Sequence, residues 1–229
     1  MRGDVVAVAI AEAFRGDGRI LASPMGPLPK LGVRLAAATF SPGLLLTDGV
    51  ATLVDLEGKP EGYMPYSRVF DVVWGGKRHV MMGASQLDQH GNQNISCIGA
   101  HEQPKVMLLG VRGGPGNTVC HPTSYFVARH SKKVFVPAVD MISGVGPSRG
   151  AREIRCVVTN LGVFDYGGPG QTMRLQTLHP GVTVEEVVEN TGFAVAIPPD
   201  CPRTPLPTDE QRAWLEGQDP DRAIRGMVE

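Results

Sequence analysis

The stretch VMMGASQLDQHGNQNI, residues 80–95, begins with three apolar residues and continues as a run of polar side chains around Gly91. A short apolar run that ends at glycine predicts a buried strand. Gly83 and Ala84 leave the backbone uncovered where this strand ends, and N–H groups of such a backbone can approach a bound polar group closely. The pattern therefore predicts either a ligand-binding strand end or a plain polar turn between two strands, and leaves both open.

Short apolar strands and amphipathic helices alternate on either side of this stretch. Predicted helices cover residues 4–14 (with Asp4 as N-cap), 28–38, 66–74 and 184–189, and predicted strands cover residues 19–22, 44–46, 106–109, 133–136, 154–159 and 173–178. Apolar strands that lack alternation and are separated by helices are typical of a parallel sheet covered on both faces. The sequence therefore predicts an α/β fold with an open, mostly parallel sheet and helices on both faces.

The length of 229 residues suits one main domain with a small appendage. We expect the domain to cover residues 1–197. Residues 198–229, rich in proline and charge, are predicted to form a C-terminal extension with a short helix near 209–216 and a loosely packed tail. Residues 50–63 are predicted to be a loop or an excursion from the main fold.

Composition excludes several classes of function. The 22 basic and 23 acidic residues nearly balance, and aromatic residues make up only 6% of the chain, so we expect no nucleic-acid partner. The longest apolar stretch, residues 5–11, is too short to span a bilayer, so we expect no membrane partner. The four cysteines are scattered without a C-x-x-C motif, which favours a reducing, cytoplasmic location.

Most common catalytic motifs are missing. The glycine-rich segment 110–117 lacks the Lys-Ser/Thr of a phosphate-binding loop, and no G-x-S-x-G elbow occurs. The six histidines lack metal-ligand spacing, so we expect no metal, and His90 is either a surface turn residue or a general base. Two glycine-rich strand ends, at Gly83 and at residues 113–116, remain as site candidates because ligands of such sheets bind at the carboxyl ends of strands. Loop flexibility is the alternative explanation for both.

The order of several of these segments along the chain matches a known family. Residues 83–94, 113–117, 157–164 and 178–182 together resemble the β subunits of family I coenzyme A transferases, and the resemblance covers about residues 4–195. It implies the open α/β sheet of transferase subunits. It also implies an α-subunit partner, in an αβ or α2β2 assembly, with the active site between the subunits. A coenzyme A thioester would be the substrate, and no cofactor is implied.

The resemblance fails at one position. The family carries a catalytic glutamate at the end of the strand after the second helix, whereas Thr47 stands there in this chain. Threonine cannot form the acyl anhydride and the glutamyl thioester that coenzyme A transfer requires. Asp48 lies one residue on, where a strand would direct its side chain to the opposite face.

A transferase framework without its nucleophile resembles the β subunits of actinobacterial steroid ring-cleaving hydrolases, a subgroup that residues 45–49, 62–65 and 91–96 also suit. This resemblance implies hydrolytic carbon–carbon cleavage of a cyclic β-oxo acyl-coenzyme A in steroid (cholesterol) degradation. The general base would be a carboxylate of the α subunit. The alternatives are a coenzyme A transferase of the 3-oxoacid or glutaconate type that uses Asp48, and a non-catalytic subunit that only shapes the partner's pocket.

The resemblance also implies a set of site residues. Substrate or coenzyme A would be bound by Gly83, Ala84, Ser85, Gln86, Gly113, Gly114, Gly116 and Asn117. The polar candidates near the acyl group are Thr47, Asp48 and Asn94. No residue of this chain is assigned a firm catalytic role.

Overall fold

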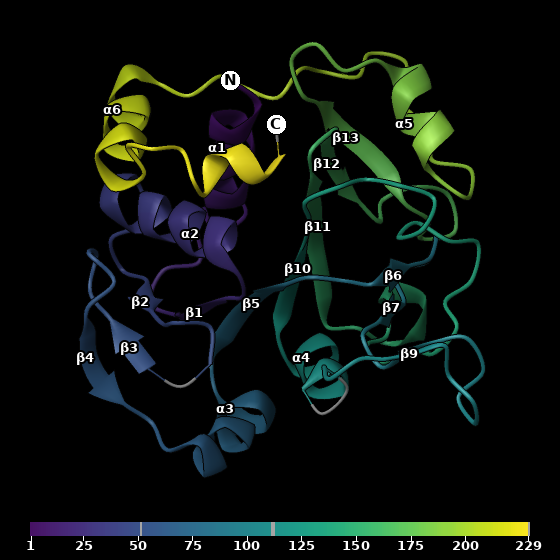
Figure 1. The fold of residues 1–229 in the computed structure, drawn as a ribbon, viewed down its shortest axis with the longest axis horizontal. Coiled ribbons are helices and arrows are strands. Elements are labelled where there is room, and N and C mark those ends of the chain that lie inside the picture. Colours follow the sequence, from purple (N-terminus) through teal and green to yellow (C-terminus); the bar gives the residue numbers. More distant parts are fainter. Residues whose placement is uncertain (51, 111–112, 229) are drawn as a thin grey trace.

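The computed structural model describes residues 1–50, 52–110 and 113–228. Its main feature is a seven-stranded sheet with the order β13-β12-β11-β10-β5-β1-β2 (Figure 1). The strands are β1 (Leu21–Pro24), β2 (Leu45–Leu46), β5 (Arg78–Met82), β10 (Pro122–Val127), β11 (Glu153–Thr159), β12 (Gly162–Asp165) and β13 (Arg174–Leu178). Strands β2, β1, β5, β10 and β11 pair in parallel, whereas β12 pairs antiparallel with both β11 and β13. The predicted open, mostly parallel sheet is confirmed.

One face of the sheet is covered by helices from both ends of the chain. Figure 1 shows α1 (Arg2–Glu12), α2 (Pro27–Thr39), α6 (Asp209–Gln218) and the 3-10 helix η3 (Arg225–Val228) gathered on one side. Helix α1 is buried from Gly3 to Ala11, as its almost continuous apolar sequence requires. The prediction of Asp4 as N-cap is wrong. The helix begins at Arg2, and the Asp4 carboxylate lies inside its first turn, where it accepts a hydrogen bond from Arg225.

The opposite face carries shorter elements. They are η1 (Tyr66–Arg68), α3 (Val69–Gly75), β6 (Gln86–Leu87), β7 (Gln93–Asn94), β8 (Cys97–Ile98), β9 (Val106–Met107), α4 (Gly114–Cys120), η2 (Pro147–Arg149) and α5 (Val184–Asn190). The side chains of β5 alternate between the two faces of the sheet. Met81 packs with α1 and α2, whereas Val80 and Met82 belong to a separate hydrophobic cluster on the opposite face. Because side chains alternate along a strand, Arg78 lies on the same face as Val80 and Met82.

Two segments differ from their predicted structure. Within residues 50–63, predicted as a loop or an excursion, β3 (Thr52–Val54) and β4 (Pro60–Tyr63) form a hairpin; Ala51 lies outside the described residues. Asp55 makes the turn, because its Oδ1 accepts the N–H of Lys59 at 2.8 Å. The predicted strand 133–136 is instead a turn whose Phe135 forms a single bridge with Leu87.

The C-terminal segment is well packed, so the prediction of a loose tail is wrong. Leu215 of α6 is fully buried against α1 and α2, and Val228 is 3% exposed. Helix α6 begins with a capping box between Thr208 and Gln211. The division into a domain of residues 1–197 and an extension of residues 198–229 stays a prediction. In the described part of the chain, none of the helices combines the length and apolar content that crossing a membrane requires.

Candidate active site

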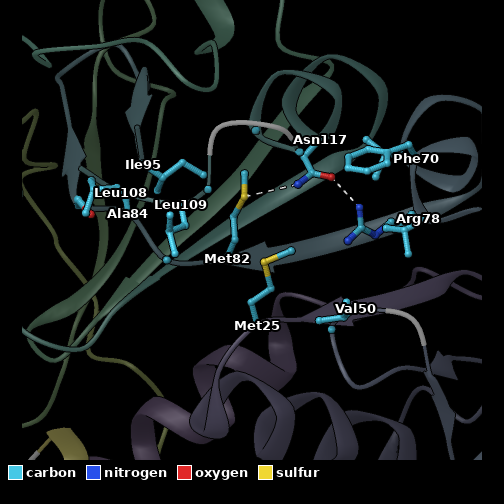
Figure 2. Close-up of a pocket in the computed structure, with 18 of the residues that line it drawn as sticks. Met25, Val50, Phe70, Arg78, Met82, Ala84, Ile95, Leu108, Leu109 and Asn117 are labelled. Atoms are coloured by element: carbon cyan, nitrogen blue, oxygen red, sulfur yellow. Dashed lines mark hydrogen bonds between the residues drawn. The ribbon is translucent and has the colours of Figure 1, made fainter. Parts of the chain in front are cut away.

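A cavity of about 1020 Å³ lies over β5, on the side of the sheet away from α1 and α2. Figure 2 shows Ala84, Ile95, Leu108 and Leu109 at one end, Met25 and Met82 in the middle, and Phe70, Arg78 and Asn117 at the other end. The remaining described lining residues are Gly49, Val50, Tyr66, Val69, Val73, Gly83, Ser85, Gly110, Gly113 and Gly114. The walls are mainly apolar, and none of these described residues carries a carboxylate.

The backbone at the end of β5 forms one part of the wall. The Ser85 N–H donates to the Asn94 carbonyl at 3.1 Å, and the Gln93 Nε2 donates to the Gly83 carbonyl at 2.5 Å. Among the described residues, no backbone acceptor pairs with the N–H of Gly83 or of Ala84. A Cβ on Gly83 would meet nothing closer than 3.9 Å. Gly83 and Ala84 line the apolar cavity, and N–H groups without a backbone acceptor at such a wall would suit a developing oxyanion.

The second predicted glycine-rich end, at the start of α4, reaches the same cavity. Gly113, Gly114 and Asn117 line it. Only glycine fits at 114, because a Cβ there would lie 2.7 Å from the Ser143 carbonyl oxygen. Gly116 is not in the lining; a Cβ there would lie 2.6 Å from Val73 Cγ1, so this glycine lets α4 pack against α3. Val111 and Arg112 of the predicted segment 110–117 lie outside the described residues.

Gln86 and Asn94 lie behind the wall, in the β6–β7 hairpin. Asn94 Nδ2 donates to Gln86 Oε1 at 2.7 Å, and Gln86 Nε2 donates to the Asp140 carboxylate at 3.1 Å. Asn94 is fully buried and Gln86 nearly so, and neither lines the cavity. These amides fix the hairpin that carries Gln93 and so support the strand end. His90 lies in the turn of the same hairpin and does not line the cavity either.

Thr47 and Asp48 are placed elsewhere. The Thr47 hydroxyl donates to the Ala22 carbonyl at 2.9 Å and accepts the N–H of Gly49 at 3.0 Å. Asp48 Oδ1 accepts the N–H groups of Val50 and Thr52 at 2.8 and 3.1 Å. Both residues line a separate cavity of about 280 Å³. The structure therefore does not bring them to the Gly83 end of the large cavity.

Sequence reasoning missed Arg78, which is 4% exposed and lines the large cavity. Its Nε donates to Ser23 Oγ at 2.8 Å and its Nη1 donates to Asn117 Oδ1 at 2.6 Å. Burial lowers the pKa of this guanidinium to about 10, so it stays charged at neutral pH. The available signal was its position two residues before Val80, which puts a charge on the inner face of a buried strand.

No group of three or more His, Cys, Asp or Glu side chains suited to a metal gathers anywhere in residues 1–50, 52–110 and 113–228. The expectation of no metal stays a prediction.

Comparison with known proteins places the chain in a family. The coenzyme A transferase family profile matches residues 70–190, the segment that contains β5, the β6–β7 hairpin and α4. The chain is 48% identical over 239 residues to the IpdB subunit of the cholesterol ring-cleaving hydrolase of Rhodococcus jostii RHA1, covering 98% of this chain and 94% of that protein. The chain belongs to the coenzyme A transferase family. The family resemblance predicted from residues 83–94 and 113–117 is confirmed.

Other members of the coenzyme A transferase family extend the likeness. The IpdB subunit of the Mycobacterium tuberculosis H37Rv hydrolase is 47% identical over 227 residues, covering 92% of this chain and 91% of that protein. A chain of the crystal structure of Rhodococcus jostii RHA1 IpdAB superposes with a TM-score of 0.92 at 47% identity, over 99% of this chain and 97% of that one. The fold and nearly the whole length are thus shared.

Proposed function

We propose that this chain is the β subunit of a heteromeric hydrolase that opens the ring of a cyclic β-oxo acyl-coenzyme A during steroid (cholesterol) ring degradation. The observation that carries the proposal is that Thr47 stands at the family's glutamate position with its hydroxyl held by backbone groups, and that no carboxylate of this chain lies in the described lining of the large cavity. Coenzyme A transfer through this subunit needs such a nucleophile. Hydrolysis needs only that water be activated and that the leaving enolate be stabilised. The 48% identity to a ring-cleaving hydrolase subunit supports the same reaction.

The chemistry divides between this chain and its partner. A base in the α subunit deprotonates a water molecule, which adds to the ring ketone. The bond from the ketone carbon to the carbon next to the thioester then breaks, and its electron pair forms the thioester enolate. The N–H groups of Gly83 and Ala84 donate to the enolate oxygen, and a proton then returns to the carbon. The products are a new carboxylate and an intact thioester. The coenzyme A thioester is the substrate, and we propose no cofactor.

An α subunit is the partner that fits the cavity rim, in an αβ or α2β2 assembly. Leu109 is 98% exposed and Tyr66 is 60% exposed, although both line the cavity. Large apolar side chains exposed together indicate a protein-protein contact. A partner seated on this rim would exclude water from the cavity and bring its carboxylate to the Gly83 end.

We place the enzyme in the cytoplasm. The four cysteines are all unpaired, and Cys97 and Cys156 are buried. Free thiols in this number suit a reducing compartment.

The test is to assemble the chain with its α subunit and supply a cyclic β-oxo acyl-coenzyme A together with a free carboxylic acid as a possible acceptor. We expect ring opening and no coenzyme A on the free acid. Borohydride treatment followed by mass spectrometry should find no trapped adduct on this chain. Transfer of coenzyme A to the free acid, with an adduct on Asp48, would establish the transferase alternative instead.

Thr47→Ala is expected to leave kcat within about twofold of wild type, because the Thr47 hydroxyl is engaged by the Ala22 and Gly49 backbone. Its cost should be in stability, about 1–2 kcal/mol for the lost buried hydrogen bonds. Turnover and urea unfolding of the assembled enzyme measure both. A 100-fold loss of kcat at unchanged stability would give Thr47 the catalytic role that its position denies it.

A purely structural role for this subunit is the second alternative. It predicts that changes at the Gly83 strand end affect assembly and not kcat. Ala84→Pro and Ala84→Ser variants of the assembled enzyme separate the catalytic role from the structural one.

A further inference from the structure

Arg78 is a buried cation without a buried anion. Among the described residues, no carboxylate lies within ion-pair distance of its guanidinium. Its hydrogen-bond partners are two neutral groups, Ser23 Oγ and Asn117 Oδ1. A guanidinium has five N–H donors, and these two bonds use two of them, so three remain for a ligand in the cavity that Arg78 lines. Burying an unpaired charge is costly, and proteins normally compensate for it with a counter-charge.

The guanidinium is held in one orientation by three separate elements. Arg78 begins β5, Ser23 belongs to β1, and Asn117 belongs to α4. Asn117 is itself 2% exposed, and its Nδ2 lies 3.7 Å from Met82 Sδ, so the acceptor of the Arg78 hydrogen bond is also fixed. A donor set that is fixed before the ligand arrives is typical of a recognition site, since little side-chain entropy is lost on binding.

The place of the guanidinium along the cavity can be read from the strand register. Ser23 pairs with Val80 in the parallel ladder between β1 and β5, so the bond to Ser23 draws the guanidinium toward the level of Val80. Val80 is three residues before Gly83, which corresponds to about 10 Å along an extended strand. The side chains of Met25 and Met82 lie between these two ends (Figure 2).

We infer that Arg78 binds a carboxylate carried by the acyl group, at the end remote from the thioester. The inference rests on the proposed function in one respect: it takes the thioester to lie at Gly83 and Ala84. The ring of the substrate would then fill the apolar middle of the cavity, and a short side chain ending in a carboxylate would reach Arg78. Arginine suits this role because its planar fork matches the two oxygens of a carboxylate. Arg78 is thus a specificity-determining residue.

A phosphate of coenzyme A is the other source of an anion. It fits less well, because the route from Gly83 to Arg78 is bordered by methionine and phenylalanine side chains, and Arg78 is 4% exposed. A phosphate with two negative charges retains a hydration shell that such a site cannot replace. The experiment therefore includes a ligand that has the phosphates and lacks the acyl carboxylate.

The test measures binding and not turnover, so that it stands apart from the ring-opening assay. The assembled enzyme is titrated calorimetrically with two cyclic acyl-coenzyme A ligands whose ring ketone is reduced to an alcohol, which prevents opening. One ligand ends in a carboxylate and the other in a carboxamide of the same shape. Acetyl-coenzyme A is the third ligand. The proteins are wild type, Arg78→Met and, as a matched control, Arg68→Met, whose exposed side chain pairs with Asp71.

Wild type and Arg68→Met should bind the carboxylate ligand about 10- to 100-fold more tightly than the carboxamide, as charge-assisted hydrogen bonds require. In Arg78→Met this preference should fall below about threefold, with little change for acetyl-coenzyme A. The inference is wrong if wild type does not distinguish the two acyl ligands, a result that stands even if Arg78→Met fails to assemble. It is also wrong if Arg78→Met weakens acetyl-coenzyme A as much as the carboxylate ligand, because the anion would then be a phosphate. Failure of wild type to open the ring would instead count against the proposed function.

Discussion

Ala84→Pro is expected to lower kcat for ring opening by about 100- to 1000-fold, which is the usual effect of removing one oxyanion donor. Proline has no N–H, so the variant keeps the strand end but loses one of the two free donors in the cavity. Ala84 lies outside helices and strands and has no positive φ, so two of the usual obstacles to proline are absent at this position. Its N–H has no backbone acceptor among the described residues, so no such hydrogen bond of the fold is lost with it.

The matched control is Ala84→Ser, which adds an oxygen at the same position and keeps the N–H. It should retain kcat within about fivefold, because the donor toward the oxyanion is unchanged. Both variants should assemble with the α subunit and unfold near the wild-type temperature. An assembled Ala84→Pro enzyme that opens the ring at the wild-type rate would remove the Gly83–Ala84 strand end from the mechanism and favour the purely structural role.

Arg225→Met is expected to destabilise the protein by about 3–5 kcal/mol, the usual cost of breaking a buried ion pair from one side. Arg225 is 1% exposed and joins two distant carboxylates. Its Nη1 donates to Asp4 Oδ1 at 2.5 Å and its Nε to Asp219 Oδ2 at 3.2 Å. Methionine fills much of the volume but removes the buried cation between the two carboxylates, and Asp4 keeps only the longer contacts with Arg222 at 3.4 Å and the N-terminal amine at 3.5 Å. Urea unfolding measures the loss, and Arg212→Met, which removes an exposed pair with Asp209, should cost less than about 1 kcal/mol.

The pH dependence of this effect has a definite sign. Burial alone would raise the pKa of Asp4, but the hydrogen bond and charges of Arg225 and Arg222 outweigh it and lower the pKa below its usual value. The Asp4 carboxylate therefore stabilises the wild type above about pH 4, and this stabilisation is lost as the pH falls through the lowered pKa. In Arg225→Met the effect of burial on the pKa of Asp4 is opposed only by Arg222 and the N-terminal amine, so this pKa should rise. The gap between the two proteins should narrow on acidification, and a gap that is constant from pH 7 to pH 4 would contradict this.

The sequence was most informative where local backbone chemistry decides the structure. The apolar run before Gly83 predicted a buried strand and an open strand end, and both are present. The predicted helix over residues 184–189 is likewise present as α5, and the Glu186 N–H donates to the hydroxyl of the capping Thr183. These features depend on neighbours in sequence, so a pattern can reveal them.

Features that depend on distant partners were missed. Strand β10 lies at the centre of the sheet, but it begins with Pro122, Thr123 and Ser124, whose composition resembles a turn. The Arg78 side chain is held at the cavity by Ser23 and Asn117, which are 55 and 39 residues away in the chain. The direction of the Thr47 hydroxyl depends on the Ala22 carbonyl of the paired strand. None of these contacts leaves a periodic signal in the sequence.

In the proposed reaction water, and not a carboxylate of this chain, attacks the ring ketone before the carbon–carbon bond breaks. The most direct measurement is a single turnover of the assembled enzyme with a cyclic β-oxo acyl-coenzyme A in H₂¹⁸O, followed by mass spectrometry of the product and of this chain. We expect a ring-opened thioester with ¹⁸O in its new carboxylate and a protein chain of unchanged mass. An ¹⁸O label in an aspartate or glutamate side chain of this subunit would contradict it, because only a covalent acyl intermediate on this chain could place the label there.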